Sequence, residues 1–259
     1  MSVDAKSIIL YHRSYRKIAA SPRPFVLQFF FIALPLSLIV VFFYPDITRT
    51  VCLIAKEVLS PFFSEGSLRI VSYPYLTGNA HYLTLPGKFP SVVFSLLNAI
   101  AGLLILLLLP KIVRFKPLVI LGSVVSFIMF LSAVFFLFLP DQFPYQASDY
   151  SDLYIKQQIS IWFFVPVIMG LAVLPLPASL PSKVVAMLTS FIYSLIFGTV
   201  RYAVFLFIIG KISLLYMAVL FFALGPLVDF VYIVGIYCVY AARLAKNIKG
   251  NYTLWKWSY

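Results

Sequence analysis

The stretch IFGTVRYAVFLFIIGK, residues 196–211, is apolar almost throughout and yet carries Arg201 in its interior. Such a run is typical of a helix that crosses a bilayer, where a charged side chain costs about 2.5–3.5 kcal/mol on insertion scales. A residue of this kind is kept when it faces protein or water and makes a contact that the molecule needs. Arg201 therefore points to a membrane helix bundle and is the first candidate functional residue.

The whole chain has the composition of a polytopic membrane protein. Its 259 residues are 63% hydrophobic and 11% charged, with a mean hydropathy of +1.02, whereas soluble domains carry about 25% charged residues. The net charge of +12 fits basic residues that flank membrane helices and meet anionic lipid headgroups. We expect the bilayer and anionic headgroups as partners. We expect no nucleic acid, because no nucleic-acid-binding motif accompanies the charge.

Six apolar runs are long enough to span a bilayer. They cover residues 25–44, 91–109, 118–139, 159–177, 184–209 and 213–240. Of the 20 Lys and Arg residues, 13 then fall on the side of the termini and 6 on the other, with Arg201 inside the membrane. This bias predicts an all-α integral membrane protein with N-in, C-in topology, in a bacterial or archaeal cytoplasmic membrane.

Three segments outside the bilayer carry structural predictions, and a second outer loop, residues 140–158, holds three aspartates. Residues 1–24 have apolar positions at helical spacing among basic ones, which indicates an interfacial amphipathic helix or an ordinary basic flank. Residues 241–259 combine Trp, Tyr and Lys and are expected at the same interface. Residues 45–90 form an extracytoplasmic loop between the first two spans of the 25–240 transmembrane domain. Its first part is predicted to be an amphipathic helix on the outer surface and its second part an ordered loop.

Asp229 is the second ionisable residue deep within a span. It follows FFALGPLV, where Gly225 and Pro226 are predicted to kink the helix and free backbone carbonyls. A carboxylate beside free carbonyls suits a cation or proton site in a transporter. The alternative, which we favour, is a packing residue whose carboxylate is capped by neighbouring polar groups.

Depth argues against a direct contact between the two charges. Counted from the outer ends of their spans, Arg201 lies about 12 Å deep and Asp229 about 24 Å deep. Arg201 is therefore expected to point toward the outer face, where its partner would be an outer-loop aspartate (Asp141, Asp149 or Asp152) or an anionic lipid group. A direct or water-linked pair with Asp229 is the alternative.

The remaining polar residues carry few signals of chemistry. His81 lies in the outer loop and is either a surface residue or a site that exchanges protons near neutral pH. The sequence has no phosphate-binding glycine loop, no paired His ligands and no Gly-x-Ser-x-Gly elbow. Its two cysteines, Cys52 and Cys238, have no metal-ligand spacing. We therefore predict no catalytic residue, no metal site and no cofactor.

The arrangement after residue 153 resembles exosortase and archaeosortase membrane proteins. The stretches IKQQISIWFFVPVIMGLAVLPLP, SLPSK, FGTVRYAVFLF and LLYMAVLFFALGPLVDF have the order of spans and turns seen in that family, and Arg201 matches its arginine. The resemblance covers under half of the chain. It would imply a transpeptidase-like enzyme of the cell envelope, but no cysteine stands at 157–160 and no histidine at 211–216. Without a nucleophile, acyl transfer of this type is not expected.

Three functional hypotheses follow. The first is a non-enzymatic membrane subunit of a cell-envelope assembly, such as one for exopolysaccharide synthesis or export or for protein anchoring, with other membrane subunits as partners. The second is a small transporter or lipid-handling protein that uses Arg201 and Asp229. The third is a degenerate exosortase-like transpeptidase. The sequence favours a protein that is not an enzyme.

Overall fold

The computed structural model describes residues 16–18, 22–247 and 255–257. Within this part of the chain, six helices are long and apolar enough to cross a membrane, in agreement with the number predicted. They are Pro24–Phe62, Val92–Ile112, Lys116–Phe138, Ala147–Val173, Leu180–Ile212 and Leu214–Asn247.

Several of these long helices contain short π-helical or 3₁₀ segments. The α-helices are α1 (Pro22–Gln28), α2 (Leu34–Leu59), α3 (Val92–Ile112), α4 (Lys116–Phe138), α5 (Ala147–Val173), α6 (Leu180–Phe207) and α7 (Pro226–Asn247). The π-helical segments are Phe29–Ala33, Ile208–Ile212 and Val219–Ala223, and the 3₁₀ segments are Ser60–Phe62, Pro140–Gln142 and Leu214–Tyr216. The strands are β1 (Arg16–Ile18), β2 (Arg69–Tyr75), β3 (Gly78–Thr84) and β4 (Trp255–Trp257).

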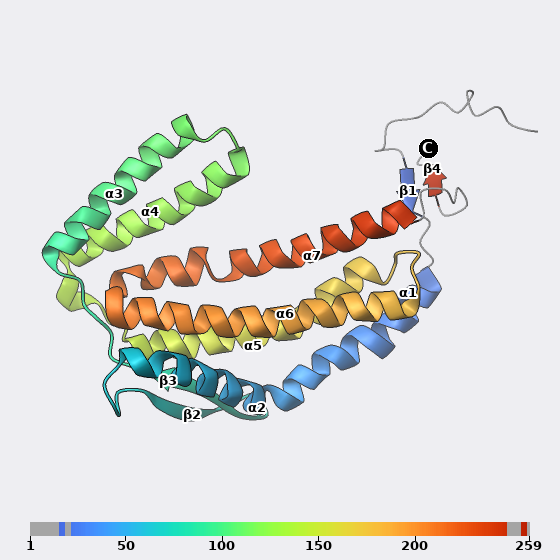
Figure 1. The fold of residues 1–259 in the computed structure, drawn as a ribbon, viewed down its shortest axis with the longest axis horizontal. Helices are drawn as coiled ribbons and strands as arrows, with labels where there is room; N and C mark the ends of the chain where they lie inside the picture. Colours follow the sequence, from blue (N-terminus) through green and yellow to red (C-terminus); the bar gives the residue numbers. More distant parts are fainter. Residues whose placement is uncertain (1–15, 19–21, 248–254, 258–259) are drawn as a thin grey trace, which may run out of the picture.

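The core is built by α2, α5, α6 and α7, which run alongside one another (Figure 1). The largest side chains buried between α5 and α6 are aromatic. Trp162, Tyr154 and Tyr202 are all at most 2% exposed, and the rings of Tyr154 and Tyr202 stack with centroids 5.2 Å apart. Such rings fill a wide interhelical space, and each carries a polar atom that needs a partner when buried. The core is therefore also where the polar contacts of the bundle gather.

A β-hairpin stands where the sequence predicted only an ordered loop. Strands β2 and β3 pair antiparallel from Arg69↔Thr84 to Tyr75↔Gly78, and the hairpin packs on α2 and α5. The Tyr44 hydroxyl of α2 donates to the Tyr75 carbonyl and accepts from the Gly78 N–H at 2.6 Å. The all-α prediction thus holds for the helical bundle and needs this hairpin added to it.

Two helices include residues that the sequence predicted for the outer loops. The expected separate outer helix at 45–59 is the continuation of the first one, because α2 runs unbroken to Leu59 with Pro45 inside it. Helix α5 begins at Ala147, twelve residues before the expected start at residue 159. A capping box fixes that start: the Gln146 side chain accepts a backbone N–H, and the Asp149 carboxylate accepts the Gln146 N–H at 2.7 Å.

Helices α3 and α4 pack closely on each other and lean away from α7 (Figure 1). Small residues make the contact: Gly102 of α3 lies against Phe130 and Ser126 of α4, as in membrane helix pairs where small side chains let backbones approach. The pair joins the bundle mainly at one end, where Tyr216 donates to Asn98 at 2.8 Å.

Two short strands from the N-terminal and C-terminal parts of the chain pair with each other. Strand β1 pairs antiparallel with β4, with Arg16 opposite Trp257. The amphipathic helix predicted within residues 1–24 is absent at residues 16–18, where the chain is extended. From Pro22 onward the chain forms α1, which continues into the first long helix. The rest of that prediction lies outside the described residues. In the C-terminal direction, α7 continues beyond the predicted residue 240 to Asn247.

Candidate functional site

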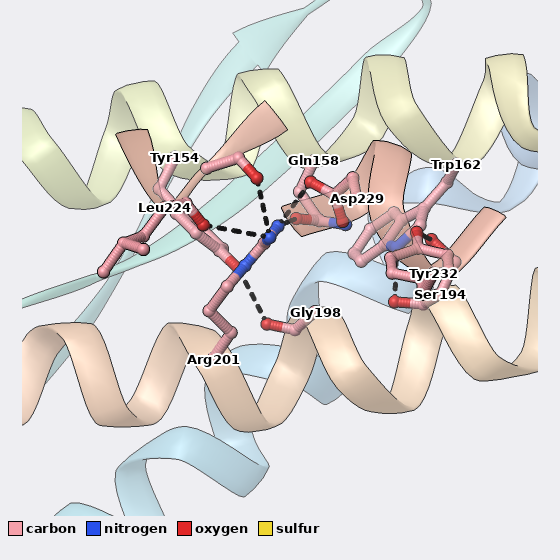
Figure 2. A network of polar contacts seen from close by, with 10 residues as sticks. Tyr154, Gln158, Trp162, Ser194, Gly198, Arg201, Leu224, Asp229 and Tyr232 are labelled. Atoms are coloured by element: carbon pink, nitrogen blue, oxygen red, sulfur yellow. Dashed lines mark hydrogen bonds and ion pairs between the residues drawn. The ribbon is translucent and has the colours of Figure 1, made fainter. Parts of the chain in front are cut away.

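Three helices bring polar side chains together around Arg201 (Figure 2). Arg201 lies on α6, and Tyr154 and Gln158 are four residues apart on α5, so they share the face that meets it. Asp229 is in the first turn of α7. The side chains of Arg201 and Asp229 are each only 4% exposed. The site is therefore enclosed by the bundle.

The guanidinium group of Arg201 is bonded at all three of its nitrogens. Nε donates to the Tyr154 hydroxyl at 3.0 Å, and Nη2 donates to Gln158 Oε1 at 3.0 Å and to Asp229 Oδ2 at 2.7 Å. Nη1 donates to the carbonyls of Leu224 and Gly225 at 3.4 and 2.9 Å. These contacts match the five N–H donors that an arginine has. The charge is neutralised and hydrogen-bonded within the chain.

The break before α7 supplies two of the acceptors. The π-helical segment Val219–Ala223 is capped at its C-terminal end by Leu224, and α7 begins at Pro226. Proline has no N–H and disfavours helical geometry in the residue before it, so carbonyls just upstream are free to turn toward Arg201. A Cβ on Gly225 would lie 2.4 Å from the Phe221 carbonyl oxygen. Only glycine fits this break.

A second glycine brings α5 close to α6. A Cβ on Gly198 would lie 2.7 Å from Gln158 Nε2, and the Gly198 carbonyl accepts the Tyr154 hydroxyl at 2.9 Å. The absence of a side chain at Gly198 is therefore what lets Gln158 reach Arg201. Beyond this layer, the Tyr232 hydroxyl donates to Ser194 Oγ at 2.7 Å and Trp162 Nε1 donates to the Ser194 carbonyl at 3.4 Å.

Some buried polar atoms at this site make no hydrogen bond within the described residues. Asp229 Oδ1 and Gln158 Nε2 are buried and have no hydrogen-bond partner there. The same is true of Gln157 Oε1, whose amide lies beside the Gly225 break. Buried polar atoms generally pair with protein or ordered water. These three atoms are therefore exceptions to that rule within the described residues.

None of the three aspartates expected as outer partners contacts Arg201 in the described part of the chain. Asp149 caps α5, and Asp152 pairs with Lys156 at 2.7 Å on the same helix. Asp141 lies in the 3₁₀ segment Pro140–Gln142 and is not among the contacts of Arg201. The prediction that Arg201 points to these aspartates and not to Asp229 is wrong.

The depth estimate failed because it treated both helices as straight. Helix α6 continues through the π-helical segment Ile208–Ile212, so Arg201 lies twelve residues and not eight before the turn at Ser213. On the other side of that turn, the 3₁₀ and π-helical segments and the break at Gly225 displace the chain from a straight path. The two charges therefore reach the same level.

His81 is not part of this site. It lies on β3, where its backbone N–H donates to Thr48 Oγ1 at 3.2 Å and its carbonyl accepts the Cys52 thiol at 3.3 Å. Cys52 thus meets the His81 backbone and not its imidazole, so the two do not form a thiol–imidazole pair. His81 Nδ1 is buried without a partner among the described residues.

A second buried cluster, centred on Tyr202, joins the β2–β3 hairpin to α5 and α6. The Tyr202 hydroxyl, next along α6 from Arg201, accepts the Leu83 N–H of β3 at 2.9 Å and lies 2.6 Å from Ser151 Oγ of α5. Tyr202, Tyr154 and Gln158 were not singled out from the sequence. For Tyr154 and Gln158, the available signal was the set of polar residues at helical spacing in SDYSDLYIKQQ, residues 148–158, which precede the predicted span at 159–177.

No family model, no curated protein and no solved structure matches this chain. In the part of the chain that the structure describes, no three His, Cys, Asp or Glu side chains lie close enough to hold a metal ion. At 157–160, where the resemblance to exosortases would require a cysteine, Gln158 contacts Arg201 through its amide. The Gln158 amide accepts a hydrogen bond there, and an amide cannot replace a cysteine thiolate as a nucleophile.

Proposed function

We propose that this chain is a non-enzymatic integral membrane subunit of a cell-envelope assembly, with both termini on the cytoplasmic side of a bacterial or archaeal membrane. The observation that carries the proposal is the closed set of contacts around Arg201. A guanidinium whose donors are used by Asp229, Gln158, Tyr154 and two carbonyls holds three helices together. It is not presented to a substrate.

The α3–α4 pair is the surface that we assign to a partner subunit. It attaches to the bundle mainly at one end (Figure 1), and both helices carry exposed apolar side chains along their length, including Leu104 and Phe127. Exposed apolar surface on a membrane helix pair is covered by lipid or by another helix. Because the α3–α4 pair leans away from the rest of the bundle, it offers more of this apolar surface than a helix packed within the bundle does.

Site-specific photocrosslinking in native membranes tests this proposal. A crosslinker at position 104 or 127 is expected to give one discrete heavier product, whose second polypeptide copurifies at fixed stoichiometry in mild detergent. The matched control is position 168 on α5, where Ile168 is similarly exposed and no such product is expected. A chain that purifies alone, with crosslinks to lipid at all three positions, would contradict the subunit proposal.

A second candidate, a small transporter, is favoured by Asp229 Oδ1 and Gln158 Nε2, which have no hydrogen-bond partner within the described residues. Asp229 follows the break at Gly225. Broken helices that offer carbonyls and a carboxylate at mid-depth bind ions in transporters. Thermal stabilisation of the purified chain by Na⁺ but not by K⁺, lost in Asp229→Asn, would support this candidate. Equal responses of the wild-type chain and Asp229→Asn to both ions would exclude it for these ions.

A further inference from the structure

A long groove runs between α6 and α7 toward the C-terminal end of the bundle. Its volume is about 660 Å³, and most of its wall is apolar, with Val185 and Val239 among the lining residues. Tyr193 and Tyr232 line one end, and Arg243 and Asn247 line the other. The groove is thus apolar for most of its length and polar where α7 ends.

The length of the groove fits one leaflet of a bilayer. Its lining on α7 extends from Tyr232 to Asn247, which corresponds to about 22 Å at 1.5 Å per residue. Half of a hydrocarbon core is about 15 Å thick, and the headgroup region adds several ångströms. An extended acyl chain with its headgroup therefore covers the distance.

The charge of the groove selects the headgroup. Among the described residues that line the groove, Arg243 is the one cation and none is a carboxylate. Within the described residues, Arg243 makes no ion pair and no hydrogen bond, and it is exposed. Asn247 and the hydroxyls of Ser182 and Tyr240 line the same end. A phosphate at this position would meet one free guanidinium and several neutral donors.

We propose that this groove binds one anionic phospholipid from the leaflet that holds the end of α7. One acyl chain lies along the groove, and the phosphate meets Arg243. Gly235 leaves room for the chain, since a Cβ added there would meet nothing within 4 Å. The inference requires that α6 and α7 cross a bilayer, and it does not depend on the subunit proposal.

Native mass spectrometry of the full-length chain in detergent, titrated with phosphatidylglycerol and phosphatidylcholine, tests the headgroup contact. One basic residue near a membrane surface contributes about 1 kcal/mol, so we expect about a fivefold preference for phosphatidylglycerol. Arg243→Gln is expected to abolish that preference and Arg243→Lys to retain most of it. The matched control is Arg114→Gln, in the α3–α4 connection outside this groove, which should leave the preference unchanged.

A second variant tests the acyl-chain contact without touching the charge. Gly235→Leu fills the open part of the groove and is expected to lower the affinity for both lipids at least several-fold. Val231→Leu adds a methylene at an exposed position of the same helix outside the groove lining and should have no effect. Equal binding of the two lipids by the wild-type chain, a preference that survives Arg243→Gln, or unchanged binding by Gly235→Leu would each overturn the proposal.

Discussion

Nη2 of Arg201 lies 2.7 Å from Oδ2 of Asp229, and the two side chains are each 4% exposed. The residues come from α6 and from the first turn of α7, on opposite sides of the turn at Ser213. The contact therefore ties together two helices that are consecutive in the chain. Tyr154 and Gln158 extend it to α5. In a low-dielectric interior, removing one partner of such a pair leaves the other charge buried and uncompensated.

Gly225→Ala is expected to destabilise the protein. A Cβ at this position would lie 2.4 Å from the Phe221 carbonyl oxygen, so the break must shift and the Gly225 carbonyl moves away from Arg201. Overpacking of this kind costs about 1–3 kcal/mol. Denaturant unfolding in mixed micelles measures the effect. The control is Gly235→Ala, which meets no atom within 4 Å and should be neutral or stabilising by about 0.5–1 kcal/mol.

Leu76→Asn is expected to stabilise the β2–β3 hairpin. Leu76 is the first of the two residues between the strands and has a φ of +46°, a left-handed conformation that asparagine adopts more readily than leucine does. The gain should be about 1 kcal/mol or less, measured as slower hydrogen exchange of the hairpin amides. Thr77→Asn serves as the control, because Thr77 has no positive φ. An equal gain in both variants would contradict the explanation.

Tyr202→Phe is expected to loosen the hairpin from the bundle. The substitution removes the hydroxyl that accepts the Leu83 N–H and leaves a buried donor unpaired, at a cost of about 1–3 kcal/mol. The Leu83 amide should exchange with solvent faster, while amides in α3 and α4 keep their rates. Tyr145→Phe, at an exposed tyrosine, should change neither quantity. An unaltered rate of hydrogen exchange at the Leu83 amide in Tyr202→Phe would contradict the proposal that this hydrogen bond holds the hairpin against the bundle.

Tyr73 of β2 is expected to make stability fall in strongly basic solution. Burial, followed by the nearby carboxylate of Asp152, raises the pKa of the Tyr73 hydroxyl above its ordinary value. The unfolded chain therefore loses this proton first, near pH 10. The contribution of Tyr73 to the free energy of unfolding is fully present below about pH 10 and is lost as the pH rises further. Tyr73→Phe should show a smaller loss of stability between pH 9 and about pH 11; identical curves would contradict the assignment.

The helical bundle was predictable because its signals are long and redundant. Each of the six apolar runs gave one membrane-length helix, and the Gly225–Pro226 step lies where α7 begins. The β2–β3 hairpin was not predictable in the same way. Its two-residue turn is Leu76–Thr77 and lacks the Asn-Gly or Asp-Gly pair that usually marks such turns. The strand pairing is fixed by contacts with α2, which the sequence does not display.

The site was predictable in its residues but not in its geometry. An apolar run makes a charged residue conspicuous, so Arg201 and Asp229 could be found by inspection. Their contact depends on π-helical segments and on the break at Gly225, and counting at a constant rise per residue does not include these. Tyr154 and Gln158 were hidden because α5 begins twelve residues earlier than its apolar run.

The central claim is that Arg201 is an internal contact of the bundle, and a double-mutant cycle tests it most directly. In unfolding measurements, Arg201→Met and Asp229→Leu are each expected to cost about 3–5 kcal/mol, because each leaves a buried charge unpaired. The double variant should cost clearly less than the sum, since no charge is left. The partly exposed Lys156–Asp152 pair serves as the control and should couple by about 1 kcal/mol or less. Additive losses for Arg201 and Asp229 would contradict the account.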